Sequence, residues 1–216
     1  MNFLSELKNR ANALQGLQAG EQQDAAANTH ACETACRVAV KYLQDLCAQL
    51  NIIQPPAPGH YSLDGKTPFP ALVMRSFRCD DRRKMLRNET VCDYIGMGWD
   101  LLPGTGRVAT HSVTVNFPPD LERVALRVSI GQIKHERKEQ RHPETNKLLA
   151  YVFEYQTEAR GFITITPDHD SGQIAFRLVN VGGFELFSTR YPAAKVNSAL
   201  MDELAKKLLG QLSRFG

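Results

Sequence analysis

The sequence lacks the features that most directly assign a function. No apolar run approaches the length of about 18 residues that a membrane-spanning helix requires. There is no GxxxxGK(S/T) phosphate loop, no GxGxxG turn opening a helix, no GxSxG elbow and no HExxH zinc motif. The first residues are amphipathic, without the charged stub and apolar block of a secretory signal. We therefore expect a cytoplasmic protein with no membrane segment, and the missing motifs favour a binding protein over an enzyme.

Cysteine is scarce, and its spacing does not build a metal site. Five cysteines in 216 residues are an odd number, in a chain long enough to fold without disulfides, which is typical of reduced thiols. Zinc ligands usually come as several close pairs. Cys32 and Cys36 form the only such pair, and their small side chains also suit close helix packing. We therefore predict no metal and no cofactor.

The N-terminal residues predict helices. Gly16 and Gly20 separate a short amphipathic segment from a longer one that runs from about Glu21 to Ile53. In the first segment the apolar residues at helical spacing are Phe3, Leu4, Leu7, Ala11, Leu14 and Leu17. We therefore predict a helical hairpin over residues 1–53, either packed on the rest of the chain or standing apart as a module. Self-association into a homo-oligomer through these helices and the Leu-rich C-terminal helix is a further possibility.

Residues 54–70 and 71–216 predict a linker followed by a sheet. The first range holds five of the eleven prolines and is expected to be irregular. In the second, apolar and polar residues alternate with period two in several runs, and a Leu-rich helix of about 18 residues closes the chain. We expect strands on both sides of a turn at 103–106, one at 124–130 that continues into polar residues, and one at 151–165. The predicted fold class is α+β: a curved antiparallel β-meander of five to six strands, covered on one face by the N-terminal helices and a C-terminal helix.

A basic arm extends from residue 132 to residue 147. Charged residues stand at both odd and even positions of this segment, so in a strand they would lie on both faces. Neither face is then buried, and the hairpin is expected to project into water. Its candidate partner-binding residues are Lys134, Arg137, Lys138 and Arg141. Pairing across the HPETNK turn would place Lys138 near Tyr151 and Lys134 near Tyr155. Cations beside aromatic rings suit single-stranded nucleic acid, although the rings also suit a core beneath the lysine stems.

A second basic run lies between residues 75 and 87, where the expected strand gives way to DDRRKMLRNE. Its candidate partner-binding residues are Arg82, Arg83, Lys84 and Arg87. Closely spaced cations neutralise phosphates and release counterions. The alternative is a solvated strand end with local Asp–Arg pairs, each contributing less than about 1 kcal/mol to stability.

Polar residues among apolar ones suggest a ligand pocket as an alternative. Asp93 shares the parity of Trp99, and His111 that of Val113, so a pocket between sheet and helices would be lined by Asp93, Trp99, His111 and Tyr155. Pairing through the 103–106 turn leaves Asp93 and His111 roughly 13 Å apart, which excludes a direct acid–base pair.

Together these patterns favour a non-enzymatic binding or adaptor protein. It would grip an anionic partner, either an acidic protein surface or nucleic acid, through the projecting basic hairpin. The net charge of only +3 leaves this argument to the local clusters. The alternative is a small-molecule-binding protein or enzyme that uses the sheet–helix pocket.

Overall fold

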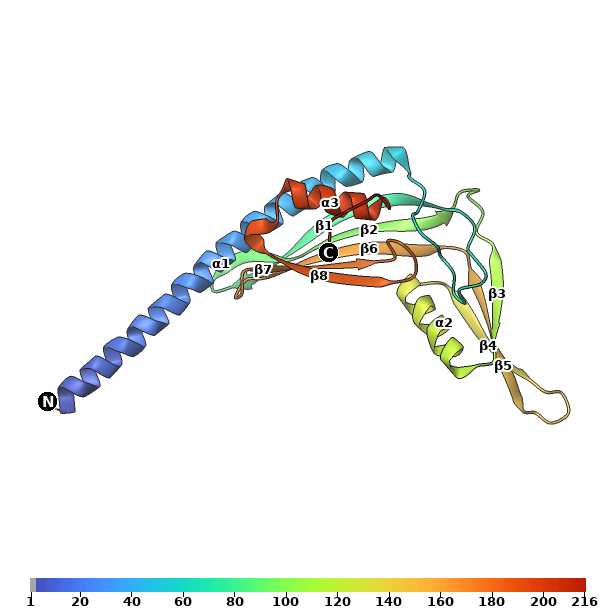
Figure 1. The fold of residues 1–216 in the computed structure, drawn as a ribbon, viewed down its shortest axis with the longest axis horizontal. Coiled ribbons are helices and arrows are strands. Elements are labelled where there is room, and N and C mark those ends of the chain that lie inside the picture. Colours follow the sequence, from blue (N-terminus) through green and yellow to red (C-terminus); the bar gives the residue numbers. More distant parts are fainter. Residues whose placement is uncertain (1–2) are drawn as a thin grey trace.

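The computed structural model describes residues 3–216 and confirms the α+β class (Figure 1). A long helix, α1 (Phe3–Ile53), and the C-terminal helix α3 (Ser198–Leu208) lie on one face of a five-stranded antiparallel sheet. A second sheet of three strands continues from one end of the first, with helix α2 (Pro118–Gly131) beside it. No helix in the described part of the chain is long and apolar enough to cross a bilayer.

Both sheets are antiparallel. The larger has the order β1-β2-β6-β7-β8, with bounds Leu72–Leu86, Glu89–Pro103, Ala159–Asp168, Gln173–Val179 and Leu186–Pro192. The smaller has the order β3-β5-β4, with bounds Thr110–Val115, Leu148–Gln156 and His135–Arg141. A single 3-10 turn, η1 (Ala193–Lys195), leads from β8 to α3.

The core lies between the larger sheet and α1. Alternate residues of the central strands point toward the helix, and Trp99, Ile163 and Phe176 are all buried there. From α1, the small or apolar side chains of Ala39 and Leu43 meet them and are fully buried. The period-two pattern therefore predicted correctly which face of β2, β6 and β7 is covered.

The predicted N-terminal helical hairpin is wrong, because α1 is one continuous helix of 51 residues. It runs through Gly16 and Gly20 without a break. A glycine inside a helix costs only about 1 kcal/mol relative to alanine, and no proline or turn-forming cluster accompanies these two. The C-terminal half of α1 packs on the sheet, and the N-terminal half extends beyond it (Figure 1). Self-association through this helix stays a prediction.

Residues 118–131 form a helix, which corrects the predicted strand at 124–130. Pro118 and Pro119 occupy the first helical positions, where the missing N–H is tolerated. Val124 and Val128 are buried one helical turn apart, whereas Leu126 is 60% exposed. The apolar residues fit a period of two and a period near four equally well over so short a run, and the two prolines decide for the helix.

Three further boundaries differ from expectation. Strand β3 pairs with β5 rather than with β2, so the 103–106 turn connects two sheets instead of closing a hairpin. The run at 151–165 is divided into β5 and β6 at Thr157, whose backbone N–H donates to the carbonyl of Ala109. Helix α3 has 11 residues rather than about 18, and Gly210, at φ +68°, turns the chain after it.

The Pro-rich segment 54–70 is irregular, as predicted, but it does not stand in solvent. Tyr61, Leu63 and Phe69 are buried in the core. The Phe69 ring stacks on Tyr155, with ring centroids 5.3 Å apart. This segment therefore joins the long helix, the large sheet and the small sheet.

Candidate functional site

The β4–β5 arm projects from the body of the protein (Figure 1). Every residue of β4 is exposed, and residues 142–149 beyond it are exposed or half-buried. The turn falls within the predicted HPETNK segment. The charge pattern therefore predicted the exposed strand β4 and its turn correctly, although Phe153 and Tyr155 of β5 are buried.

The cross-strand register of the arm differs from the predicted one by one residue. Arg137 lies opposite Phe153, and Lys138 opposite Val152. Because a slip of one residue moves a side chain to the other face, neither Lys138 nor Lys134 covers an aromatic ring. The guanidinium carbon of Arg137 lies over Tyr151 instead, 3.9 Å from the ring centroid.

Glutamates neutralise the arm. Lys138 Nζ lies 2.7 Å from Glu154 Oε2, and this hydrogen bond raises the pKa of Lys138. Lys134 pairs with Glu158 at 2.9 Å. Arg141 pairs with Glu139 at 2.7 Å. Residues 134–158 contain five Lys or Arg and five Glu, so the arm as a whole carries no formal net charge.

The basic run at 75–87 belongs to β1, which continues to Leu86, so the expectation that the strand ends before it is wrong. Most of its predicted partner-binding residues are held by carboxylates. Arg83 lies 2.5 Å from Glu33 on α1, and Lys84 lies 3.0 Å from Asp93. Arg87 pairs with Asp170 and also donates to Thr29 Oγ1. Arg82 differs, since its guanidinium lies over the ring of Tyr94, 5.7 Å from the centroid.

The arm and the basic run lie at opposite ends of the larger sheet. The β1–β2 turn sits beside α1 and the β6–β7 turn, whereas the arm leaves from the end at which β6 begins (Figure 1). The structure therefore does not bring the two sequence-predicted clusters together into one site.

The larger sheet has a second face, opposite the core, that sequence reasoning missed. Register defines rows of residues that cross the strands on this outer face. One row is Arg78, Gly98, Phe162, Val179 and Leu186. The next is Asp80, Gly96, Thr164, Arg177 and Ser188. Apart from Val179, these side chains are exposed or half-buried.

This outer sheet face is rich in arginine. Its arginines, placed by the same register, are Arg75, Arg78, Arg82, Arg160, Arg177 and Arg190. The carboxylates that the register places on this face are Asp80, Asp100 and Asp168. Arg160 lies 3.5 Å from Asp100. Hydrogen bonds from Ser171 and the nearby charge of Arg190 lower the pKa of Asp168. Among the side chains that the structure describes, the other five arginines form no salt bridge, in contrast to Lys134, Lys138 and Arg141 of the arm.

Two aromatic rings lie on the same face. Tyr94 is next to Arg82, and Phe162 has the guanidinium of Arg177 5.6 Å from its ring centroid. A shallow hollow of about 370 Å³ opens beside them over β6, β7 and β8. Thr164, Arg177 and Arg190 are among its lining residues. The face therefore combines positive charge, hydroxyl groups and accessible aromatic surface.

The alternative ligand pocket receives no such support. Trp99 and Tyr155 are each 1% exposed, and their rings stack on Phe77 and Phe69. Asp93 is a surface residue bound to Lys84, because a register irregularity beside Arg82 and Arg83 turns it away from the core. His111 is half-buried, and its ring lies beside Tyr155 with ring centroids 6.1 Å apart. The four residues do not line one cavity.

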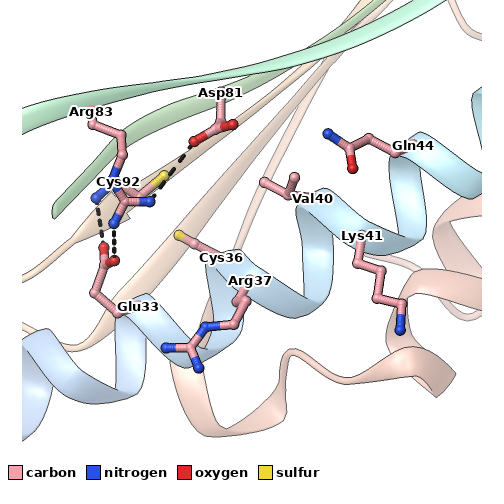
Figure 2. A pocket seen from close by; sticks show the side chains of 9 residues that line it. All are labelled: Glu33, Cys36, Arg37, Val40, Lys41, Gln44, Asp81, Arg83 and Cys92. Atoms are coloured by element: carbon pink, nitrogen blue, oxygen red, sulfur yellow. Dashed lines mark hydrogen bonds and ion pairs between the residues drawn. The ribbon is translucent and has the colours of Figure 1, made fainter.

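A cavity of about 340 Å³ lies between α1 and the β1–β2 hairpin (Figure 2). Glu33 connects its walls, since one carboxylate oxygen pairs with Arg83 and the other accepts from the backbone N–H of Cys92 at 2.6 Å. A side-chain hydrogen bond between Cys36 and Cys92 raises the pKa of Cys36 and lowers that of Cys92. No cluster of metal ligands is present among the described residues. We therefore interpret this cavity as part of the contact between α1 and the β1–β2 hairpin, which Glu33 stabilises.

Comparisons with known proteins add no assignment. No family model, no curated protein and no solved structure matches this chain. Function is therefore argued from the surfaces described above.

Proposed function

We propose that this chain is a non-enzymatic binding protein that captures an anionic partner on the outer sheet face. The observation that carries this proposal is the contrast between the two basic surfaces. In the part of the chain whose side chains the structure describes, five arginines of the outer sheet face form no salt bridge, whereas Lys134, Lys138 and Arg141 of the arm each have a carboxylate partner.

The contrast matters because a paired cation must give up one carboxylate to contact another anion. The unpaired guanidinium groups of Arg78 and Arg177 have their planar donor sets available, and such groups bind carboxylate or phosphate through two parallel hydrogen bonds. A sheet also holds its side chains at fixed spacings, which lowers the entropy lost on binding.

The arm is proposed as a second contact, with a protein partner. It projects into water, and Phe117, Leu148 and Leu149, which border a hollow beside its distal half, are large apolar side chains that remain exposed. Its neutral charge argues against a purely electrostatic role. A protein that holds an anionic partner on one surface and a protein on another would be an adaptor.

Retention on immobilised heparin, a polyanion, tests the proposal with two variants of matched charge. The sheet variant is Arg78→Ala, Arg177→Ala and Arg190→Ala, and the arm variant is Lys134→Ala, Lys138→Ala and Arg141→Ala. Each removes three positive charges. We expect the sheet variant to elute at clearly lower salt than the wild type, and the arm variant to elute near the wild type. Equal elution of all three proteins, or loss of retention in the arm variant alone, would overturn the proposal.

A further inference from the structure

Two glycines of β2 lie in the middle of the outer sheet face. Gly96 and Gly98 face the same side as Tyr94 and lie between β1 and β6. Neither φ angle lies in the left-handed region, so their backbone does not demand glycine. A Cβ atom at Gly98 would meet nothing closer than 3.9 Å, and one at Gly96 would lie 3.2 Å from the Asp80 carboxylate. Between Tyr94 and Phe162 the face is therefore a strip of bare backbone with Asp80 at its β1 edge.

An aromatic ring stands at each end of this strip. Tyr94 precedes Gly96 on β2, and Phe162 lies directly opposite Gly98 on β6. Tyr94 and Gly98 are four residues apart on one strand, which separates the two rings by about 13 Å along the strand direction. Arg82 and Arg177 lie at 5.7 Å and 5.6 Å from these rings, whereas Arg137 packs on Tyr151 at 3.9 Å. Both rings are thus only loosely covered by their arginines.

Arginines border the strip on both sides. Arg78 and Arg82 come from β1, and Arg177 and Arg190 come from β7 and β8. The row that crosses the strip at Gly96 carries the Asp80 carboxylate as well as the hydroxyl groups of Thr164 and Ser188. The four arginines outweigh this one carboxylate. Stacking surfaces with cations and hydrogen-bonding groups beside them are complementary to a flexible chain of phosphates and unpaired bases.

From this arrangement we propose that the outer sheet face binds single-stranded nucleic acid, with bases stacked on Tyr94 and Phe162 and phosphates held by the flanking arginines. This inference rests on the proposed function, since it names the anionic partner of that same surface. An acidic protein would use the arginines but would have no need of two aromatic platforms. A duplex keeps its bases stacked on one another, and this face has no helix or ribbon that would enter a groove.

Fluorescence anisotropy with a labelled oligothymidylate of about 15 nucleotides tests the inference. Wild-type protein should bind the single strand at least tenfold more tightly than a duplex of equal length and label. The double variant Tyr94→Leu, Phe162→Leu keeps charge and apolar volume but removes both stacking surfaces. It should lose at least tenfold in affinity for the single strand while its heparin retention stays that of the wild type. The aromatic control Tyr94→Phe should bind as the wild type does, and thermal unfolding checks that each variant is folded.

The outcomes separate this inference from the proposed function. Equal affinity for single strand and duplex, or unchanged binding by the double leucine variant, overturns the nucleic-acid inference. If the sheet arginine variant then still loses heparin retention, the proposed anionic surface stands with another partner. If heparin retention is insensitive to those arginines as well, both proposals fail.

Discussion

Gly161 lies directly against the indole ring of Trp99. A Cβ atom at position 161 would sit 2.1 Å from Cε2 of that ring. Trp99 is 1% exposed and is also stacked on Phe77, so the indole has no room to move aside. The glycine therefore determines how β2 and β6 pack beneath α1.

Replacing Gly161 by alanine should destabilise the protein by about 3 kcal/mol, because a well-packed core does not accept the added methyl group without displacement. Gly104→Ala is the matched control, since its Cβ would meet no atom closer than 3.5 Å. Urea unfolding monitored by Trp99 fluorescence measures both. Similar midpoints for the two variants would refute the packing account.

Helix α2 gives a second prediction, because truncating two apolar side chains two positions apart should change the free energy of unfolding by different amounts. Val124→Ala should lower the free energy of unfolding by about 2 kcal/mol, because Val124 is fully buried. Leu126→Ala should change it by less than about 0.5 kcal/mol, because Leu126 is mostly exposed. A strand would bury both side chains on one face, so comparable losses in a thermal melt would favour the strand.

Asn51 clamps the end of α1 to β1. Its Oδ1 accepts from the Phe77 backbone N–H at 2.7 Å, and its Nδ2 donates to the Phe77 carbonyl at 2.8 Å. The clamp lies at a register shift in β1, beside Ser76 at φ 57°.

Asn51→Asp keeps the acceptor but removes the donor, so we expect a loss of about 1–2 kcal/mol at neutral pH. Asn51→Ala removes both groups and should cost slightly more. Gln54→Ala, just beyond the helix, serves as the control. Wild-type stability in the aspartate variant, measured by denaturant unfolding, would contradict the clamp.

Asp64 carries a pH-dependent contribution. Burial alone would raise its pKa, but the backbone amides of Thr67 and Lys66 and the hydroxyls of Ser62 and Thr67 donate to it and lower the pKa to about 2. A lowered pKa stabilises the fold above the ordinary value near pH 4, and this stabilisation is lost as the pH falls toward 2. The side chain is partly exposed, so solvent screening limits the contribution to about 1 kcal/mol.

Asp64→Asn should therefore be less stable than the wild type at pH 6 and no less stable near pH 2. Unfolding midpoints measured across this range check the sign. A difference between the two proteins that grows toward low pH would contradict the assignment.

Alternation and charge predicted the parts of the fold that depend on local sequence. The alternating apolar positions that include Trp99 and Ile163 predicted which sheet face is covered, and the charged residues on both faces of β4 predicted the projecting arm. The continuous helix through Gly16 was missed because single glycines weaken a helix without ending it. Strand pairing was the least predictable, since β3 pairs with β5 although residues 116–147 lie between the two strands.

The candidate site was harder to foresee than the fold. Arg78, Phe162 and Arg177 are distant in sequence and meet only through the register of β1, β2, β6 and β7. The basic clusters of the arm and of the run at 75–87 consist instead of cations that are close neighbours along the chain. Neighbouring glutamates then neutralise those of the arm, which only the cross-strand geometry reveals.

Photocrosslinking tests the central claim most directly. An oligonucleotide carrying 5-iodouracil is irradiated in complex with the protein, and the linked residues are located by mass spectrometry. The account predicts adducts at Tyr94 and Phe162 on the outer sheet face. Adducts confined to the arm, for instance at Tyr151, or the absence of any specific adduct, would contradict it.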